Sequence, residues 1–138
     1  PVKAKAKPKK VRHFNYIVYL QNRRTIIQRR SGKGIWEGLF EFPLIESSEK
    51  VSKQGLEPLI QKHFGIRPTH VLQGDSIKHL LTHQTIYADF WVVPVPDFDF
   101  NRNSDTFEVD LQALGTDFAI PVLLNKFLES SLMNDLCQ

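Results

Sequence analysis

The stretch Gly34-Ile35-Trp36-Glu37-Gly38-Leu39-Phe40-Glu41-Phe42-Pro43 constrains the fold of this 138-residue sequence more than any other. It is rich in aromatic and aliphatic residues, but Gly38 and Pro43 interrupt it. A glycine inside an apolar run marks a bend or a bulge, and a proline cannot donate to a central ladder. We therefore expect residues 35–45 to form a bent, partly buried segment. Its aromatic side chains then belong to the core, and these are Trp36, Phe40 and Phe42.

Two strands are predicted before this stretch. Residues 12–20 place large side chains on alternating faces, which is typical of a β-strand. Residues 24–30 (RTIIQRR) indicate a second strand, and the turn at 21–23 would make it the hairpin partner of the first. Residues 31–34 then form a loop that leads into the quoted stretch.

A helix and two more strands are predicted after it. Leu56, Leu59, Ile60 and Phe64 share one helical face. Pro58 would be tolerated only in the first turn of this helix, and Gly65 is placed to end it. Residues 70–81 and 85–95 then indicate two strands joined at 82–84.

The C-terminal third contains weaker signals. A polar loop is expected at 94–105, a short strand at 106–109, and a final helix that begins at Pro121. Strands interrupted by one helix and closed by another are typical of an α+β protein. We predict a mixed β-sheet flanked by helices, which is an α/β/α sandwich.

Composition supports one folded domain after a basic linker. The chain is 41% hydrophobic, and its length suffices for one core but not for two domains. Residues 1–11, with five lysines and two prolines, are interpreted as an extended linker, so that 12–138 is the domain. Because the chain begins at Pro1, we expect it to be part of a longer protein. No apolar run is long enough to cross a bilayer, so no membrane partner is expected.

Positive charge is concentrated at the N-terminal side. Residues 1–36 hold 11 of the 18 Lys and Arg and no acidic residue, whereas residues 37–138 hold the other 7 and all 15 acidic residues. Such a field attracts polyanions, of which nucleic acid is the commonest. A basic tail that only improves solubility is the alternative. The candidate phosphate contacts are Arg23, Arg24, Arg29, Arg30 and Lys33.

The quoted stretch resembles the G-[LI]-W-x-G-L-x-E-F-P signature of the C-terminal domain of MutY-type adenine DNA glycosylases. Four further segments fit the same family in the same order, so the resemblance covers nearly all of residues 12–130. These segments are Phe14-Asn15-Tyr16, Gln28-Arg29-Arg30, Leu81-Thr82-His83 and Phe118-Ala119-Ile120-Pro121.

The resemblance implies a Nudix-like fold and a role in base excision repair. Such a domain helps to recognise 8-oxoguanine opposite adenine in duplex DNA, while the parent enzyme hydrolyses the N-glycosidic bond of the adenine. The catalytic acid and base and a 4Fe–4S cluster would lie in an upstream domain. We therefore expect no catalytic residue, metal or cofactor in this chain. The expected partners are the lesion duplex and that upstream domain, in the bacterial cytoplasm at the nucleoid.

The resemblance also assigns the lesion contacts to Leu81, Thr82 and His83. Guanine presents an N7 acceptor, whereas 8-oxoguanine presents an N7–H donor and an O8 acceptor, and a hydroxyl can serve both. Thr82 stands where the family more often has serine, and Leu81 stands where it often has phenylalanine. A core role for Leu81 and a turn role for Thr82 and His83 remain the alternatives.

A true Nudix hydrolase is the first rival interpretation. Its motif, G-x5-E-x7-R-E-U-x-E-E-x-G-U, supplies glutamates that hold a divalent cation against a pyrophosphate. Aligned without gaps on Gly65, the motif's Arg-Glu falls on Pro58-Leu59, its Glu-Glu on Lys62-His63, and its upstream glutamate on Lys50. A gap in the alignment could place Glu46 or Glu49 at the upstream position, but it cannot restore the pair of glutamates that the motif requires in the helix. The second rival is a non-catalytic basic module that binds RNA or protein.

Overall fold

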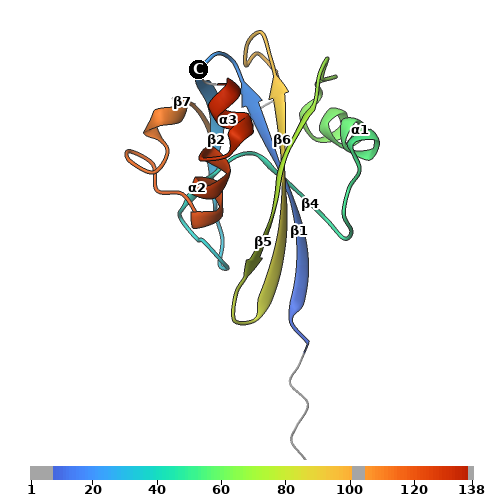
Figure 1. Ribbon diagram of the computed structural model, residues 1–138, viewed down its shortest axis with the longest axis vertical. Coiled ribbons are helices and arrows are strands. Elements are labelled where there is room, and N and C mark those ends of the chain that lie inside the picture. The colour runs from blue at the N-terminus through green and yellow to red at the C-terminus, as the bar shows by residue number, and fades with distance from the viewer. Residues whose placement is uncertain (1–7, 101–104, 137–138) are drawn as a thin grey trace, which may run out of the picture.

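The computed structural model describes residues 8–100 and 105–136. Most of the predicted linker (1–7), part of the predicted loop (101–104) and Cys137 lie outside the described residues. In chain order the elements are β1 (Lys10–Leu20), β2 (Arg24–Arg29), β3 (Phe40–Glu41), β4 (Leu44–Ser47), α1 (Lys53–Phe64), β5 (Leu72–Leu80), β6 (Gln84–Pro94), β7 (Thr106–Asp110), a 3-10 turn (Leu111–Ala113), α2 (Val122–Leu128) and α3 (Ser131–Leu136), as Figure 1 shows.

The larger sheet is mixed and is built around β1. Its order is β4-β1-β6-β5, with β1 parallel to β6 and antiparallel to β4. Residues 14–20 are all buried because both faces of β1 are covered. Tyr16 and Val18 pack into the core on the α2 side, whereas Ile17 and Tyr19 pack into the core beneath α1. Helices lie on both sides of this sheet in Figure 1, so the predicted sandwich is confirmed.

The prediction that β2 is the hairpin partner of β1 is wrong. The chain does turn sharply after β1, where Asn22 has φ 54°. However, β2 pairs with β3 and β7 in a second sheet of order β3-β2-β7. One physical reason is that β6 occupies one edge of β1 along its whole length, and β4 occupies the other edge from His13 to Tyr16. The quoted aromatic stretch is bent as expected, because β3 and β4 belong to different sheets.

Helix α1 ends at Gly65 as predicted. Ser52 caps its start by accepting a hydrogen bond from the Gly55 N–H at 3.1 Å, and Gly65 adopts the left-handed conformation with φ 69°. The expectation for Pro58 is wrong, since Pro58 lies inside the helix beyond its first turn. The fold tolerates it because this face of the helix is exposed, and water can reach the carbonyl that lacks its usual donor.

The helix predicted to begin at Pro121 is confirmed as α2, and a second short helix, α3, follows it. The chain breaks between α2 and α3, and both helices contribute to one core. The Phe127 ring stacks on Phe90 at 4.3 Å between centroids. A Cβ at Gly74, within the irregular part of β5, would lie 3.0 Å from the Phe127 ring and 3.0 Å from the Phe90 carbonyl. Glycine at this position therefore allows α2 to pack closely against the sheet.

Candidate nucleic-acid interface

The loop between β5 and β6 is a two-residue hairpin turn. The Leu81 N–H donates to the Gln84 carbonyl at 2.9 Å, which closes the turn around Thr82 and His83. The Lys10 N–H donates to the His83 carbonyl at 3.2 Å, so the start of β1 holds the other side. The antiparallel pairing of β5 with β6 confirms the two strands predicted at 70–81 and 85–95.

The three predicted lesion contacts differ in exposure. Leu81 is half-buried and packs against the larger core, whereas Thr82 and His83 are exposed. Leu81 therefore anchors the turn, and the two polar side chains are the ones that project into solvent. Of the roles weighed from the sequence, the packing role of Leu81 fits its burial best.

The basic N-terminal segment enters the fold beside this turn. Strand β1 begins at Lys10, two residues before the predicted start of the domain, and Lys10 lies opposite Gln84. Lys9 and Lys10 are both exposed. Their charges are consequently concentrated near Thr82 and His83, where a DNA phosphate could reach them.

The predicted phosphate contacts do not form one cluster. Arg23 and Arg24 follow Leu20, which pairs with Pro94 at the far end of β6 from Gln84. With about 3.3 Å per residue, the length of β1 separates the two ends by roughly 30 Å. Figure 1 shows the β1–β2 turn and the β5–β6 turn at opposite ends of the molecule. Arg23 and Arg24 therefore cannot belong to a compact site around Thr82.

Arg29 and Lys33 lie nearer the turn. Both are exposed, and the loop that carries Lys33 reaches the end of β5, since the Trp36 and His79 rings are 5.8 Å apart. Arg29 lines an open pocket of about 440 Å³. Glu37 and Asp105 line the same pocket, and their charges oppose that of Arg29.

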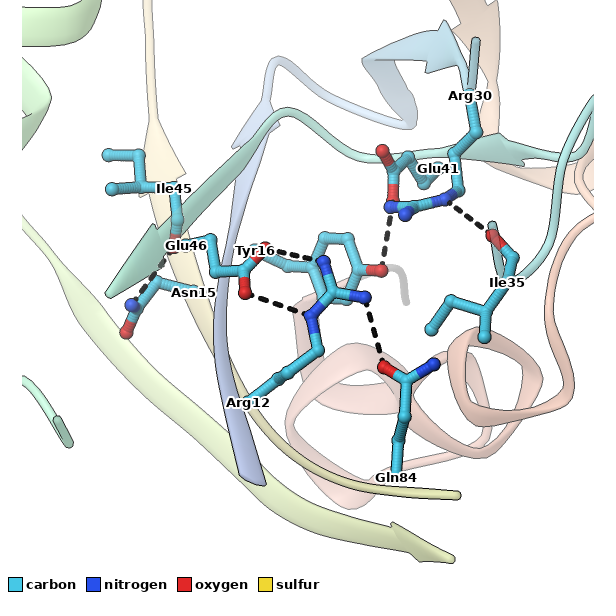
Figure 2. Close-up of polar contacts among 9 residues, drawn as sticks. All are labelled: Arg12, Asn15, Tyr16, Arg30, Ile35, Glu41, Ile45, Glu46 and Gln84. Carbon is cyan, nitrogen blue, oxygen red and sulfur yellow. Dashed lines mark hydrogen bonds and ion pairs between the residues drawn. The ribbon is translucent and has the colours of Figure 1, made fainter. Parts of the chain in front are cut away.

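Arg30 is committed to an internal ion pair. Its Nη1 lies 2.8 Å from Oε1 of Glu41, and its Nε donates to the Ile35 carbonyl at 3.1 Å. Glu41 is only 2% exposed, and it also accepts from the Tyr16 hydroxyl at 2.9 Å and from Gln28 at 3.1 Å. Burial, reinforced by Glu41, raises the pKa of Tyr16 well above its usual value. Figure 2 shows the part of this network formed by Arg30, Glu41 and Tyr16, and the network is structural rather than available to a ligand.

A second network lies next to the turn, and its hydrogen bonds were not predicted from the sequence. The Arg12 guanidinium donates to both carboxylate oxygens of Glu46, at 2.9 and 2.6 Å, and its Nη1 donates to Oε1 of Gln84 at 3.1 Å (Figure 2). The hydrogen bonds from Arg12 lower the pKa of Glu46. The pair is therefore intact above the usual carboxyl pKa and is lost as pH falls through the lowered value. A sequence signal existed, since Arg12 is the only charged residue of β1 after Lys10.

The features of a Nudix metal site are not assembled. Leu59 packs into the core beneath α1, while Lys62 and His63 are exposed on its surface. Glu46, which a gapped motif would place upstream, is paired with Arg12. In residues 8–100 and 105–136, no group of three or more His, Cys, Asp or Glu residues could hold a metal ion. Within the same residues, no helix has the length and apolar character needed to cross a membrane.

The comparisons with known proteins agree with this fold. The profile of the NUDIX domain matches residues 15–130. The chain belongs to the NUDIX family. No match was found among curated protein sequences.

Several solved structures resemble the chain along nearly its whole length. The C-terminal domain of mouse MUTYH, solved in complex with human PCNA, has a TM-score of 0.68 at 15% identity, over 90% of this chain and 88% of that one. The MutT protein of Methanosarcina mazei Go1 has a TM-score of 0.65 at 17% identity, over 94% and 99%. The E. coli ORF135 protein has 0.64 at 16%, over 92% of each chain. At these identities the likeness establishes the NUDIX fold alone.

Proposed function

We propose that this NUDIX domain is the C-terminal lesion-recognition domain of a MutY-type adenine DNA glycosylase, and that it favours 8-oxoguanine opposite adenine. The observation that carries the proposal is the turn at Leu81–His83, which presents an exposed hydroxyl beside a basic segment. The likeness to the mouse MUTYH domain supports it, as does the GIWEGLFEFP signature. Duplex DNA and an upstream catalytic domain are then the partners.

The chemistry of the turn fits the lesion edge. Thr82 is exposed and lies at the tip of a hairpin, so its hydroxyl can enter a groove and both accept and donate a hydrogen bond. Half-buried Leu81 fixes the backbone that carries this hydroxyl, and His83 stands next to Lys10 on the side where phosphate would lie. The 4Fe–4S cluster of the parent enzyme would belong to the upstream domain, because such clusters take four cysteines and this chain has one.

Thr82→Ala is expected to reduce the preference of the chain for 8-oxoguanine over guanine opposite adenine. Losing one hydrogen bond costs about 1 kcal/mol, or more if its partner stays buried and unpaired. The loss should fall on the lesion duplex, because unmodified guanine presents the wrong pattern at N7. Fluorescence anisotropy with both duplexes at one salt concentration measures it.

Two variants control for this result. Thr82→Ser keeps the hydroxyl and is expected to bind like the wild type. Leu81→Ala removes the anchor of the turn and should weaken binding to both duplexes. If Thr82→Ala weakens both complexes equally, or neither, then the hydroxyl does not read the lesion.

A NUDIX hydrolase of oxidised nucleotides is the second candidate, and the likeness to MutT proteins favours it. The arrangement of α1 and Glu46 opposes it, since no carboxylate stands at the helical positions of the motif. We expect the pure chain to release no pyrophosphate from 8-oxo-dGTP with Mg²⁺, and no adenine from an adenine:8-oxoguanine duplex. Release of pyrophosphate above the buffer rate would establish the hydrolase instead. Equal binding to damaged and undamaged nucleic acid would favour the basic adaptor.

A further inference from the structure

The turn at Leu81–Gln84 lacks the backbone conformation that makes such turns stable alone. Two-residue hairpin loops favour types I′ and II′, which require a positive φ at the first central residue. Among the described residues, the non-glycine positions with positive φ are Asn22 and Trp36. Thr82 and His83 therefore adopt ordinary negative φ values, and contacts from outside the hairpin must hold the turn.

Those contacts come from one side. The Lys10 N–H binds the His83 carbonyl, and the Gln84 side chain accepts from Arg12. Arg12 is itself fixed by the two-point bond to Glu46 of β4, and its guanidinium lies 4.8 Å from the centroid of the Phe14 ring. Planar, bidentate pairing of this kind restricts an arginine in a way that a lysine cannot reproduce. A continuous chain of hydrogen bonds thus runs from Glu46 through Arg12 to Gln84 (Figure 2).

We propose that Arg12 is a positioning residue for the lesion-reading turn, and that Glu46 supports it. The Arg12 side chain is 18% exposed, and each of its three guanidinium nitrogens already donates a hydrogen bond to Glu46 or Gln84, so it acts through Gln84 rather than by touching DNA phosphate. The expected effect on lesion preference rests on the proposed function. The expected effect on the order of the turn does not depend on that function.

Glu46→Gln separates positioning from simple charge. Removing a negative charge should strengthen DNA binding if electrostatics alone matter. If Glu46 supports Arg12, the same change should instead reduce lesion preference. Glu49→Gln is the matched control, because it removes the same charge from a nearby exposed residue whose side chain takes no part in the chain of hydrogen bonds. Arg12→Lys keeps the positive charge but loses the planar, bidentate pairing with Glu46.

The experiment measures two quantities on the 138-residue chain. Amide hydrogen exchange is followed at Leu81 and Lys10, whose N–H groups hold the turn, with Val18 as a core reference. The ratio of affinities for duplexes with 8-oxoguanine or guanine opposite adenine is measured at one salt concentration. We expect Glu46→Gln and Arg12→Lys to speed exchange at Leu81 and Lys10 roughly three- to tenfold, and to lower the affinity ratio toward one. Glu49→Gln should change neither.

The two readouts separate the possible failures. Unchanged exchange at Leu81 and Lys10 in both variants overturns the positioning role, whatever happens to DNA binding. Equally faster exchange at Val18 also overturns it, because the effect is then global destabilisation. In a third outcome, the two variants exchange faster at the turn alone, and the wild-type chain shows no lesion preference. That outcome supports the positioning of the turn and rejects the proposed function.

Discussion

Arg30→Met should lower the free energy of unfolding by about 3–5 kcal/mol, which is the usual cost of leaving one charge of a buried pair without its partner. Glu41 is 2% exposed, and Arg30 is its only cationic partner among the described residues. Tyr16 and Gln28 would still donate to Glu41, but two neutral donors do not replace a guanidinium. Because small domains are stable by only about 5–15 kcal/mol, the variant should lose a large share of its stability. Urea denaturation followed by tryptophan fluorescence measures the change.

Arg29→Met is the matched control. It removes the same side chain from the neighbouring, exposed position, where surface substitutions usually stay within about 0.5 kcal/mol. The double variant Arg30→Met/Glu41→Gln should recover part of the loss, since a buried amide needs no counter-charge. An Arg30→Met chain as stable as Arg29→Met would show that the ion pair between Arg30 and Glu41 does not stabilise the fold.

DNA binding should weaken by on the order of a hundredfold between about 50 and about 200 mM monovalent salt. Each phosphate contact adds about 0.9 to the slope of log affinity against log salt, and roughly four exposed basic side chains give this loss. Those side chains are Lys9, Lys10, Arg29 and Lys33. Titration of a labelled duplex at several salt concentrations gives the slope.

A deletion of residues 1–8 tests the linker. It keeps Lys9 and leaves the backbone N–H of Lys10, which holds the turn, in a peptide bond. The deletion should reduce the slope if the linker touches DNA. Arg23→Gln with Arg24→Gln should leave it unchanged, because these residues lie at the other end of β1. A slope near zero for the intact chain rejects the electrostatic interpretation.

Much of the fold could be predicted from local patterns. Alternation in β1 and β6, the buried face of α1 and the stop at Gly65 all arise from side chains within one element. The partner of β2 could not be predicted in this way, because it depends on which edges of β1 are already taken. Pro58 was restricted to the first turn by a local rule, which exposure to solvent relaxes.

The candidate site, too, could be predicted from the sequence only in part. The sequence pointed to the turn at 81–83 through its resemblance to a family, and the structure places Thr82 and His83 in solvent. It could not separate Arg30 from Arg29, since only the fold shows that one faces Glu41 and the other faces water. Nor could it connect Arg12 with Glu46 and Gln84, which are brought together by strand register across three strands.

Lesion preference in the wild-type chain tests the central claim most directly. Two duplexes that differ only in 8-oxoguanine or guanine opposite adenine are titrated with the 138-residue chain at one fixed salt concentration. One added hydrogen bond predicts an affinity roughly two- to tenfold higher for the lesion duplex. Equal affinities for the two duplexes would contradict the assignment of this NUDIX domain to 8-oxoguanine recognition.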